Sequence, residues 1–286
     1  MSQTIEIARP EHPETRHKAI IFDDVAIAFE GTQVLNGISF ELLRGQTKIV
    51  LGVAGSGKST ILKLVLGLIR PDRGRIFVLG HEVTSMREEE LFDLRRNIGM
   101  VFQESALFDS LTVRDNVAFR LNEEHDIAPE EIDHRVAEAL RFVELEHTMD
   151  MFPAELSGGM RRRVAIARAI INRPEILLYD SPTGGLDPIT STKIIELLLK
   201  QRDQYHTSAL MVTHRLPDAF LMATNYYDVQ AKEMRPLNGT AHPGAPHTDV
   251  HTAFMILRDG KIIFDGNAAE LTAAASRDAY IREYIS

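Results

Sequence analysis

Residues 47–68 read TKIVLGVAGSGKSTILKLVLGL, and this stretch decides the fold. Its first part, TKIVLGV, has the apolar run of a buried strand, and KSTILKLVLGL has apolar positions that suit a buried helix. A glycine-rich loop lies between the two. The order of strand, glycine loop and helix is typical of a strand in a largely parallel sheet. The sequence therefore predicts an α/β fold.

The loop itself matches the pattern G-x-x-x-x-G-K-[ST] of a phosphate-binding loop. The glycines let backbone N–H groups approach phosphate oxygens, the helix N-terminus adds positive potential, and the lysine reaches the β- and γ-phosphates. The hydroxyl that follows the lysine ligates Mg²⁺. We therefore predict a nucleotide site made of Gly52, Ala54, Gly55, Ser56, Gly57, Lys58, Ser59 and Thr60, with Ser59 as a metal ligand.

A second candidate metal ligand ends the apolar run ILLYD at residues 176–180. A carboxylate at the carboxyl end of a parallel strand suits an acid linked to Mg²⁺. Taken alone, Asp180 equally suits an ordinary strand end before the turn at Ser181-Pro182. The phosphate-binding loop favours the metal role.

The rest of the chain divides into segments of different pattern. Turn-prone pairs at Glu30-Gly31 and Arg44-Gly45 separate the first strands, and Asp259-Gly260 between two apolar runs predicts a type I′ hairpin. Strands are predicted at residues 19–29, 34–42, 75–79, 98–102, 176–179 and 209–213, and helices at 129–143, 158–171 and 278–286.

These patterns predict three parts of the chain. Residues 1–18 are polar and contain proline, which is typical of a disordered tail. Residues 19–266 form the main α/β domain, with an inserted helical subdomain at about 104–171 and an exposed insertion at about 225–252, where proline and glycine are frequent and periodicity is weak. Residues 267–286 form a C-terminal helical extension.

Composition excludes several classes of function. Lys and Arg total 32 against 41 Asp and Glu, and the resulting net charge of −9 disfavours a broad nucleic-acid-binding surface. The chain has no cysteine, so it has no disulfide framework or thiolate site. It also has no apolar run near the ~20 residues of a membrane helix, and its first residues lack the apolar part of a signal peptide. We expect a cytoplasmic chain that reaches a membrane only through a partner.

The segment LSGGMRRRVAIARAI at residues 156–170, just before the ILLYD strand, resembles the signature helix of the ATP-binding cassette (ABC) ATPases. The resemblance covers residues 19–266 apart from the insertion. It implies the P-loop NTPase ABC ATPase fold, in which a mixed core sheet carries an antiparallel β subdomain and an inserted helical subdomain. It also implies that the chain binds ATP with Mg²⁺ and hydrolyses it.

The same resemblance assigns further site residues. Gln103 matches the Q-loop glutamine, a catalytic residue and metal ligand, Asp187 matches the D-loop aspartate, and His214 matches the switch histidine. Phe29 stands where the family places an aromatic ring on adenine, although a core strand residue would look the same.

In this family two chains pair head to tail. Ser157, Gly158 and Gly159 of one chain would present a helix N-terminus to the γ-phosphate held by the other. We therefore expect a second ATPase chain as partner, in a homodimer or a heterodimer. Arg161, Arg162 and Arg163 resemble a nucleic-acid patch in isolation, but adjacent residues fan out around a helix. We expect them to make solvated or interchain contacts, with no nucleic acid bound.

Four features resemble the ATPase subunits of MCE-type phospholipid transporters, the group that maintains lipid asymmetry. They are Met160 in LSGGM, the Arg-rich continuation, QESALFDSLTVRDNVAF at residues 103–119, and the ending DAYIREYIS. This resemblance implies a peripheral subunit on the cytoplasmic face of a bacterial inner membrane that powers phospholipid or related lipid transport. It also implies a separate permease contacting about 104–119 and an MCE-type lipid-binding protein reached through that permease.

One residue departs from the family pattern. Where the family has a glutamate that polarises the attacking water, DSPT places Ser181. A serine hydroxyl does not accept a proton near neutral pH, so hydrolysis should be slower by something like 10²–10⁴-fold unless another group substitutes. His214 is one candidate, with an ordinary pKa near 6.5. Alternatively, positioning alone sustains a slow rate.

Ser181 also keeps other functions open. The chain would be an ATP-gated regulatory subunit if it dimerised on ATP and hydrolysed negligibly. It would be half of a heterodimer if a partner supplied the glutamate. A third alternative, an ABC protein of translation or DNA repair, is disfavoured by the acidic charge and by the permease-like segment.

Overall fold

The central element of the fold is a six-stranded sheet with the strand order β12-β11-β3-β8-β7-β6. Five of these strands run parallel, and β12 pairs antiparallel with β11. The computed structural model describes residues 17–123, 127–237 and 252–285, so the predicted tail falls almost wholly outside the described residues. The sheet consists of β3 (Thr47–Leu51), β6 (Ile98–Val101), β7 (Ile176–Asp180), β8 (Ser208–Thr213), β11 (Thr252–Arg258) and β12 (Lys261–Gly266).

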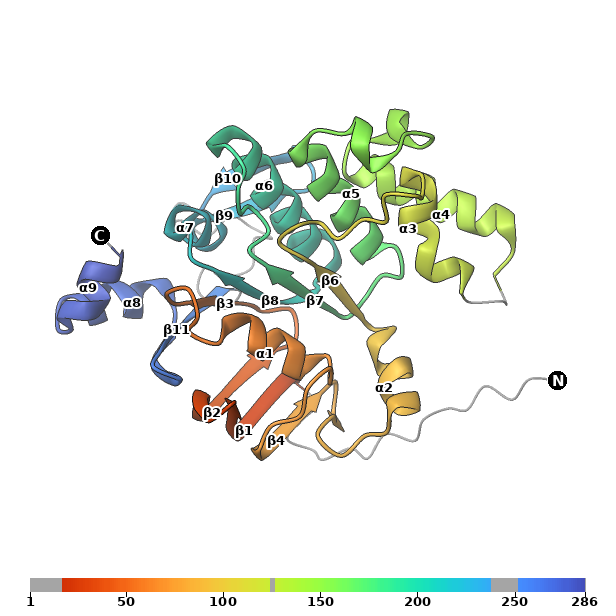
Figure 1. Cartoon of the computed structure of the whole chain (residues 1–286). Helices are drawn as coiled ribbons and strands as arrows, with labels where there is room; N and C mark the ends of the chain where they lie inside the picture. Colours follow the sequence, from red (N-terminus) through yellow and green to blue (C-terminus); the bar gives the residue numbers. More distant parts are fainter. Residues whose placement is uncertain (1–16, 124–126, 238–251, 286) are drawn as a thin grey trace.

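Alternate residues of the parallel strands face two separate cores. Ile49 and Leu51 of β3 belong to the core that contains α5 (Gly158–Ile170) and α6 (Pro188–Tyr205). Val50 belongs to the core that contains α1 (Lys58–Val65). Figure 1 shows the result, in which α5 and α6 lie on one side of this sheet and α1 on the other. Burial on both faces explains why these strands are continuous apolar runs.

A second sheet packs with α1 and α2 (Glu88–Arg95), on the side of the sheet opposite α5. It is antiparallel throughout, with the order β2-β1-β4-β5. Phe22 of β1 and Phe40 of β2 stack across it with ring centroids 4.5 Å apart. The two sheets together confirm the predicted mixed core sheet with an antiparallel β subdomain. The strands are β1 (Lys18–Phe29), β2 (Thr32–Leu43), β4 (Arg73–Val78) and β5 (His81–Glu82).

Two of the predicted turns, one in each of these sheets, form with left-handed backbone at both central residues. Glu30 and Gly31 have φ angles of 49° and 80°, and Asp259 and Gly260 have φ angles of 49° and 71°. Positive φ at both central residues is what a type I′ hairpin requires. The Gly260 carbonyl accepts a hydrogen bond from the Asn36 N–H at 2.8 Å, so the second hairpin is fixed to β2.

Helices fill most of the segment predicted as a helical subdomain. Asn116 is fully buried and its amide bonds the backbone of Phe108, Leu111 and Thr112, which fixes the path of the chain into α3. Pro129 occupies the first turn of its helix, a position that needs no backbone donor. The helices are α3 (Val113–Asn122), α4 (Pro129–Phe142) and α5, with single 3₁₀ turns at Glu146–Thr148 and Pro153–Glu155.

The first part of the insertion predicted at 225–252 forms secondary structure that the sequence pattern does not predict. Residues 225–236 form a hairpin of β9 (Asn225–Asp228) and β10 (Glu233–Pro236) that packs on α6. Tyr227 is buried there, and its N–H donates to the Asp203 carboxylate at 2.7 Å. Four-residue strands are too short to produce a visible period, so sequence pattern missed them. Residues 238–251 lie outside the described residues.

The C-terminal residues form two short helices beside β11 and β12, as Figure 1 shows. Leu271 and Ile281 bury their side chains in the core on the α5 side of the sheet. Over the described ranges, none of the helices has the length and apolar character that a bilayer span requires. The remaining helices are α7 (Leu216–Thr224), α8 (Ala268–Ala275) and α9 (Ala279–Ile285).

Candidate functional site

The predicted site residues of four strands meet at one edge of the six-stranded sheet. In the register of the parallel strands, Leu51 of β3 pairs with Thr213 of β8, and Asp180 of β7 pairs with Val212 of β8. Val101 of β6 pairs with Tyr179 of β7. The carboxyl ends of β3, β6, β7 and β8 are therefore level. Ligands of open α/β sheets bind at this edge.

The glycine loop leaves β3 at this edge. A methyl group at Gly52 would come within 2.6 Å of the Leu257 carbonyl oxygen, and Gly57 has a φ angle of 96°, so both positions require glycine. Gly57 caps α1, and no side chain among the described residues caps the first N–H groups of this helix. Those N–H groups are the ones that hold phosphate oxygens in such loops. The cradle therefore fits the phosphates of a nucleotide.

Lys58 curls back over its own loop. Its Nζ donates to the Gly52 and Val53 carbonyl oxygens, each at 2.8 Å. Burial lowers the pKa of the Lys58 ammonium, and the negative charge of Asp180 opposes part of that shift. The carboxylate at the end of β7 and the lysine of the loop thus act on each other, as expected for two parts of one site.

The donor set beside Lys58 fits Mg²⁺, which prefers oxygen ligands. Ser59 follows Lys58 and is exposed, Asp180 ends β7, and Gln103 lies two residues after β6. The ion would be held by the Ser59 hydroxyl, the Asp180 carboxylate and the Gln103 amide oxygen. Bound there, it would neutralise developing charge on the phosphates.

Ser181 has an unusual backbone conformation. Its φ angle is 45°, and a left-handed conformation costs a residue other than glycine about 1–2 kcal/mol. The Ser181 N–H donates to the Val212 carbonyl at 2.9 Å, and the Ser181 carbonyl accepts from the Gly184 N–H at 2.9 Å. The side chain is buried. The backbone at this position is thus held by β8 and by its own loop.

His214 directly follows β8 and is exposed at the same edge. The next residue, Arg215, donates to the Leu186 carbonyl at 3.2 Å and pairs with Asp218 at 2.8 Å. Asp218 in turn accepts a hydrogen bond from the Thr183 hydroxyl. The segment of His214 is therefore tied to the loop that follows Ser181.

The predicted dimer residues gather at a different place. Ser157 caps α5, because its Oγ accepts a hydrogen bond from the Met160 N–H at 3.2 Å. Asp187 caps α6 in the same way and accepts from the Thr190 N–H at 3.0 Å. Hydrogen bonds from Thr190 lower the pKa of Asp187. A methyl group at Gly159 would come within 2.5 Å of Thr190 Cγ2, so the two helix starts are side by side.

The structure does not join these residues to the phosphate-binding loop of the same chain. Across the described residues, no hydrogen bond or ion pair links Ser157, Gly158 or Gly159 to residues 52–60. Phe29 lies at the end of β1 and is 44% exposed. Its role in stacking on adenine stays a prediction.

Arg162 corrects the expectation that the three arginines make solvated or interchain contacts. Its side chain is only 4% exposed and its guanidinium bonds backbone carbonyls of this chain. Arg163 donates to the Val143 carbonyl at 2.9 Å. A sequence signal existed, because Arg162 shares one helical face with the apolar residues Ile166 and Ala169.

Tyr284 of α9 is a second contact that sequence reasoning missed. Burial raises the pKa of the Tyr284 phenol, and the backbone of Gly52 beside its hydroxyl opposes part of that shift. Tyr280, one turn earlier, lies under the Arg258 guanidinium, 4.0 Å from it. The C-terminal extension thus touches the first glycine of the phosphate-binding loop.

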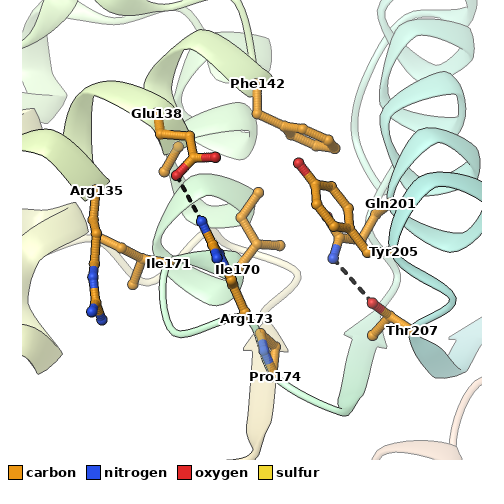
Figure 2. A pocket seen from close by; sticks show the side chains of 11 residues that line it. Arg135, Glu138, Phe142, Ile170, Ile171, Arg173, Pro174, Gln201, Tyr205 and Thr207 are labelled. Atoms are coloured by element: carbon orange, nitrogen blue, oxygen red, sulfur yellow. Dashed lines mark hydrogen bonds and ion pairs between the residues drawn. The ribbon is translucent and has the colours of Figure 1, made fainter. Parts of the chain in front are cut away.

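A cavity of about 150 Å³ lies away from this edge, where α4, the end of α5 and the end of α6 meet. In Figure 2 the Glu138 carboxylate points to Arg173, and the Gln201 amide points to Thr207. None of the predicted site residues lines it. We therefore assign the nucleotide site to the open edge of the sheet.

Comparison with known proteins gives the following similarities. The family model described as "ABC transporter" matches residues 35–184. The chain is 35% identical to the protein trigalactosyldiacylglycerol 3, chloroplastic, of Arabidopsis thaliana, over 88% of this chain and 70% of that protein. It is 40% identical to the methionine import ATP-binding protein MetN of Carboxydothermus hydrogenoformans, over 69% of this chain and 59% of that protein.

A solved structure supports the same grouping. The dimeric post-hydrolysis state of the ATP-binding cassette MJ0796, bound to ADP and phosphate, matches with a TM-score of 0.71 and 28% identity. The match covers 87% of this chain and 98% of that chain. The fold described above is thus shared with a cassette whose structure holds ADP and phosphate.

Proposed function

Because this chain belongs to the ABC transporter family of ATP-binding subunits, we propose that it powers the movement of a phospholipid or related lipid through a separate permease. The family and the fold establish an ATPase that uses ATP with Mg²⁺. The observation that carries the site is the level edge formed by the carboxyl ends of β3, β6, β7 and β8. Substrate, partners and residue roles are the proposed part.

The roles of the residues follow from their positions. The glycine loop and Lys58 hold the phosphates, because the start of α1 presents N–H groups that no side chain caps. Ser59, Asp180 and Gln103 hold Mg²⁺. His214 orients the attacking water and accepts its proton, since Ser181 has no group that does so near neutral pH.

The proposed assembly is a pair of ATPase chains. Ser157, Gly158 and Gly159 begin α5, a helix of 13 residues whose N-terminus attracts negative charge. They make no bond to the loop of their own chain among the described residues. A γ-phosphate held by a second chain is the ligand we propose for them. The dimeric state of the similar cassette supports this arrangement.

The proposed contact with the permease lies in residues 104–119. Phe108 and Phe119 are 43% and 38% exposed, and their rings meet with centroids 4.5 Å apart. Phe152 is also exposed, and the chain just before it bonds the start of α3. Exposed aromatic rings that lie together are typical of an interface. We assign this surface, Phe108, Phe119 and Phe152, to a short helix of the permease.

The proposed cargo is a lipid, reached through an MCE-type lipid-binding protein that contacts the permease. The similarity to the chloroplast protein, whose name is that of a galactolipid, extends over 88% of this chain. The similarity to the methionine importer extends over 69%. Sequence features at residues 156–170, 103–119 and 278–286 favour the lipid group. Methionine is the competing cargo.

The experiment that tests the cargo uses the chain together with its copurified membrane proteins in liposomes. We expect ATP-dependent movement of a fluorescent phospholipid and no uptake of labelled methionine. The same complex carrying Lys58→Ala is the control and should move neither. Methionine uptake without phospholipid movement would refute the lipid proposal.

The permease contact has its own test. Phe108→Ser should leave the ATPase rate of the isolated chain unchanged and abolish the stimulation by membrane partners. Phe92→Ser is the matched control, because Phe92 is 55% exposed but lies on α2, outside the proposed surface. Equal stimulation in both variants would contradict the assignment.

One observation favours a second function. Ser181 replaces the carboxylate base, so hydrolysis slow enough to be irrelevant would make this chain an ATP-gated regulatory subunit. In that case Ser181→Glu should create turnover that the natural chain lacks.

A further inference from the structure

Arg162 joins two segments of the site that are far apart in sequence. It lies on α5, one turn after Ser157, and its guanidinium is buried. Its Nε donates to Ser105 Oγ at 3.3 Å and its Nη2 donates to the Gln103 carbonyl. Its Nη1 donates to the Ser181 carbonyl at 3.0 Å. One side chain therefore holds both the segment after β6 and the loop after β7.

The acceptors of Arg162 are neutral. Two of them are the backbone carbonyls of Gln103 and Ser181, and one is the Ser105 hydroxyl. The Gly184 carbonyl, 3.4 Å from Nη2, is a third and longer carbonyl contact. Burial lowers the pKa of this guanidinium, and the charge of Glu104 opposes the shift. An arginine stays protonated in a protein even so. The planar fork of five N–H donors matches several carbonyls at once, which a lysine ammonium does not.

Both segments that Arg162 holds have left-handed backbone. Ser105 and Ala106 have φ angles of 65° and 48°, and Ser181 has a φ angle of 45°. Residues other than glycine keep such angles only where the surroundings impose them. The bonds from Arg162 are part of what imposes them. Loss of these bonds should let both segments relax.

Arg168, six residues later on the same helix, provides a natural comparison. It donates to the Ser105 carbonyl at 2.9 Å and to the Ala106 carbonyl at 2.8 Å. It therefore supports the segment after β6 as Arg162 does, and burial lowers its pKa as well. No bond of Arg168 reaches residues 181–184 in the described part of the chain.

We propose that Arg162 is a positioning residue for ATP hydrolysis. Its guanidinium couples the Gln103 segment to the loop at Ser181–Gly184. This inference rests on the proposed function of the edge site. Gln103 begins the segment that leads to the proposed permease surface, and Ser181 follows the metal ligand Asp180. A shift of the Gln103 segment is transmitted through the guanidinium to the loop beside the reacting phosphate.

The coupling between the Gln103 segment and the Ser181 loop affects the rate of hydrolysis more in this chain than it would in a site with a carboxylate base. Ser181 supplies no base, so the rate of hydrolysis depends on how accurately the remaining groups are held. A displacement of about 1 Å at a reacting group costs about 100-fold in rate. ATP binding depends instead on the loop of residues 52–60, which Arg162 does not touch.

The test separates binding from chemistry in the full chain. Single-turnover hydrolysis, with protein in excess over radiolabelled MgATP, gives the rate of the chemical step, and equilibrium binding of MgATP gives the Kd. Arg162→Gln should lower the single-turnover rate by about 10- to 100-fold and leave the Kd within about threefold. Arg168→Gln should change neither by more than about threefold.

A second variant guards against a folding defect in Arg162→Gln. Arg162→Lys keeps a positive charge at the same place but does not bridge two segments, so it should melt near the natural chain and still lose most of the rate. The proposal is overturned if Arg162→Lys keeps the natural rate. It is also overturned if Arg162→Gln and Arg168→Gln lose rate equally, or if the Kd rises as much as the rate falls.

The outcome is independent of cargo and permease. The chemical step is read on the isolated chain, so failure to move lipid would refute the proposed cargo and leave the Arg162 result intact. Conversely, normal lipid movement together with an unaltered rate in Arg162→Lys would refute only the positioning role.

Discussion

Arg215 and Asp218 form an ion pair at 2.8 Å, which ties the residue after His214 to the first turn of α7. The Asp218 side chain is 7% exposed, and it also accepts from the Thr183 hydroxyl. Both members of the pair also bind the loop between Ser181 and Asp187. Asp218 does so through the Thr183 hydroxyl, and Arg215 donates to the Leu186 carbonyl. One ion pair thus sets the distance between two loops of the site.

Asp218→Ala should therefore destabilise the fold. It leaves a partly buried guanidinium and a buried hydroxyl without their acceptor, at a cost of about 2–3 kcal/mol in the free energy of unfolding. Urea denaturation measures this as a lower midpoint at an unchanged slope. Asp23→Ala is the control, since it removes an exposed ion pair with Arg75 and should hardly move the midpoint. Equal midpoints for the two variants would contradict the role of Asp218.

ATP binding should weaken at alkaline pH through Lys58. The phosphates bind the charged ammonium, and burial lowers the pKa of Lys58 below the ordinary 10.5, so affinity falls as pH rises through that lowered value. Asp180 raises this pKa, so Asp180→Asn should move the alkaline loss of affinity to lower pH. Equilibrium binding of ATP in EDTA between about pH 7 and about pH 10 separates this effect from metal binding.

Two comparisons make the pH experiment decisive. Lys58→Met should bind ATP weakly at every pH and show no alkaline loss, because the titrating group is gone. The account of the Lys58–Asp180 pair fails if Asp180→Asn keeps the alkaline midpoint of the natural chain.

The contact between α9 and the phosphate-binding loop predicts a local change in protection. Tyr284→Phe removes the hydroxyl beside the Gly52 backbone. A hydrogen bond between the two groups would be worth about 1 kcal/mol, so hydrogen exchange of the peptide around residue 52 should be about fivefold faster. Tyr280→Phe keeps the ring under Arg258 and should exchange as the natural chain does. If the two variants exchange alike, α9 does not support the loop.

Local pattern was enough to predict the elements that bind phosphate. The strand at residues 47–51, the loop and the helix that begins at Lys58 all form from adjacent residues, and Gly57 marks the left-handed backbone angle at the start of the helix. The hairpin at Asp259-Gly260 is equally local. These features depend on short-range sterics, which a sequence displays directly.

Contacts across long sequence separations were not predictable in the same way. The burial of Arg162 depends on carbonyls at 103 and 181, and the order of the hairpin at 225–236 depends on Asp203 of α6. The contact of Tyr284 with Gly52 spans nearly the whole chain. Each is set by packing between elements. The helical period indicates a buried face for Arg162, but no motif or period indicates which partners these residues meet.

We infer that ATP is hydrolysed at the edge formed by the loop of residues 52–60, Asp180 and His214, without a carboxylate at position 181. Single-turnover hydrolysis of MgATP by the natural chain, His214→Ala and Ser181→Glu tests it most directly. We predict measurable turnover in the natural chain and a loss of about 100-fold or more in His214→Ala, with the Kd for MgATP unchanged. A silent natural chain that turns over only as Ser181→Glu, or a His214→Ala variant as fast as the natural chain, would contradict the claim.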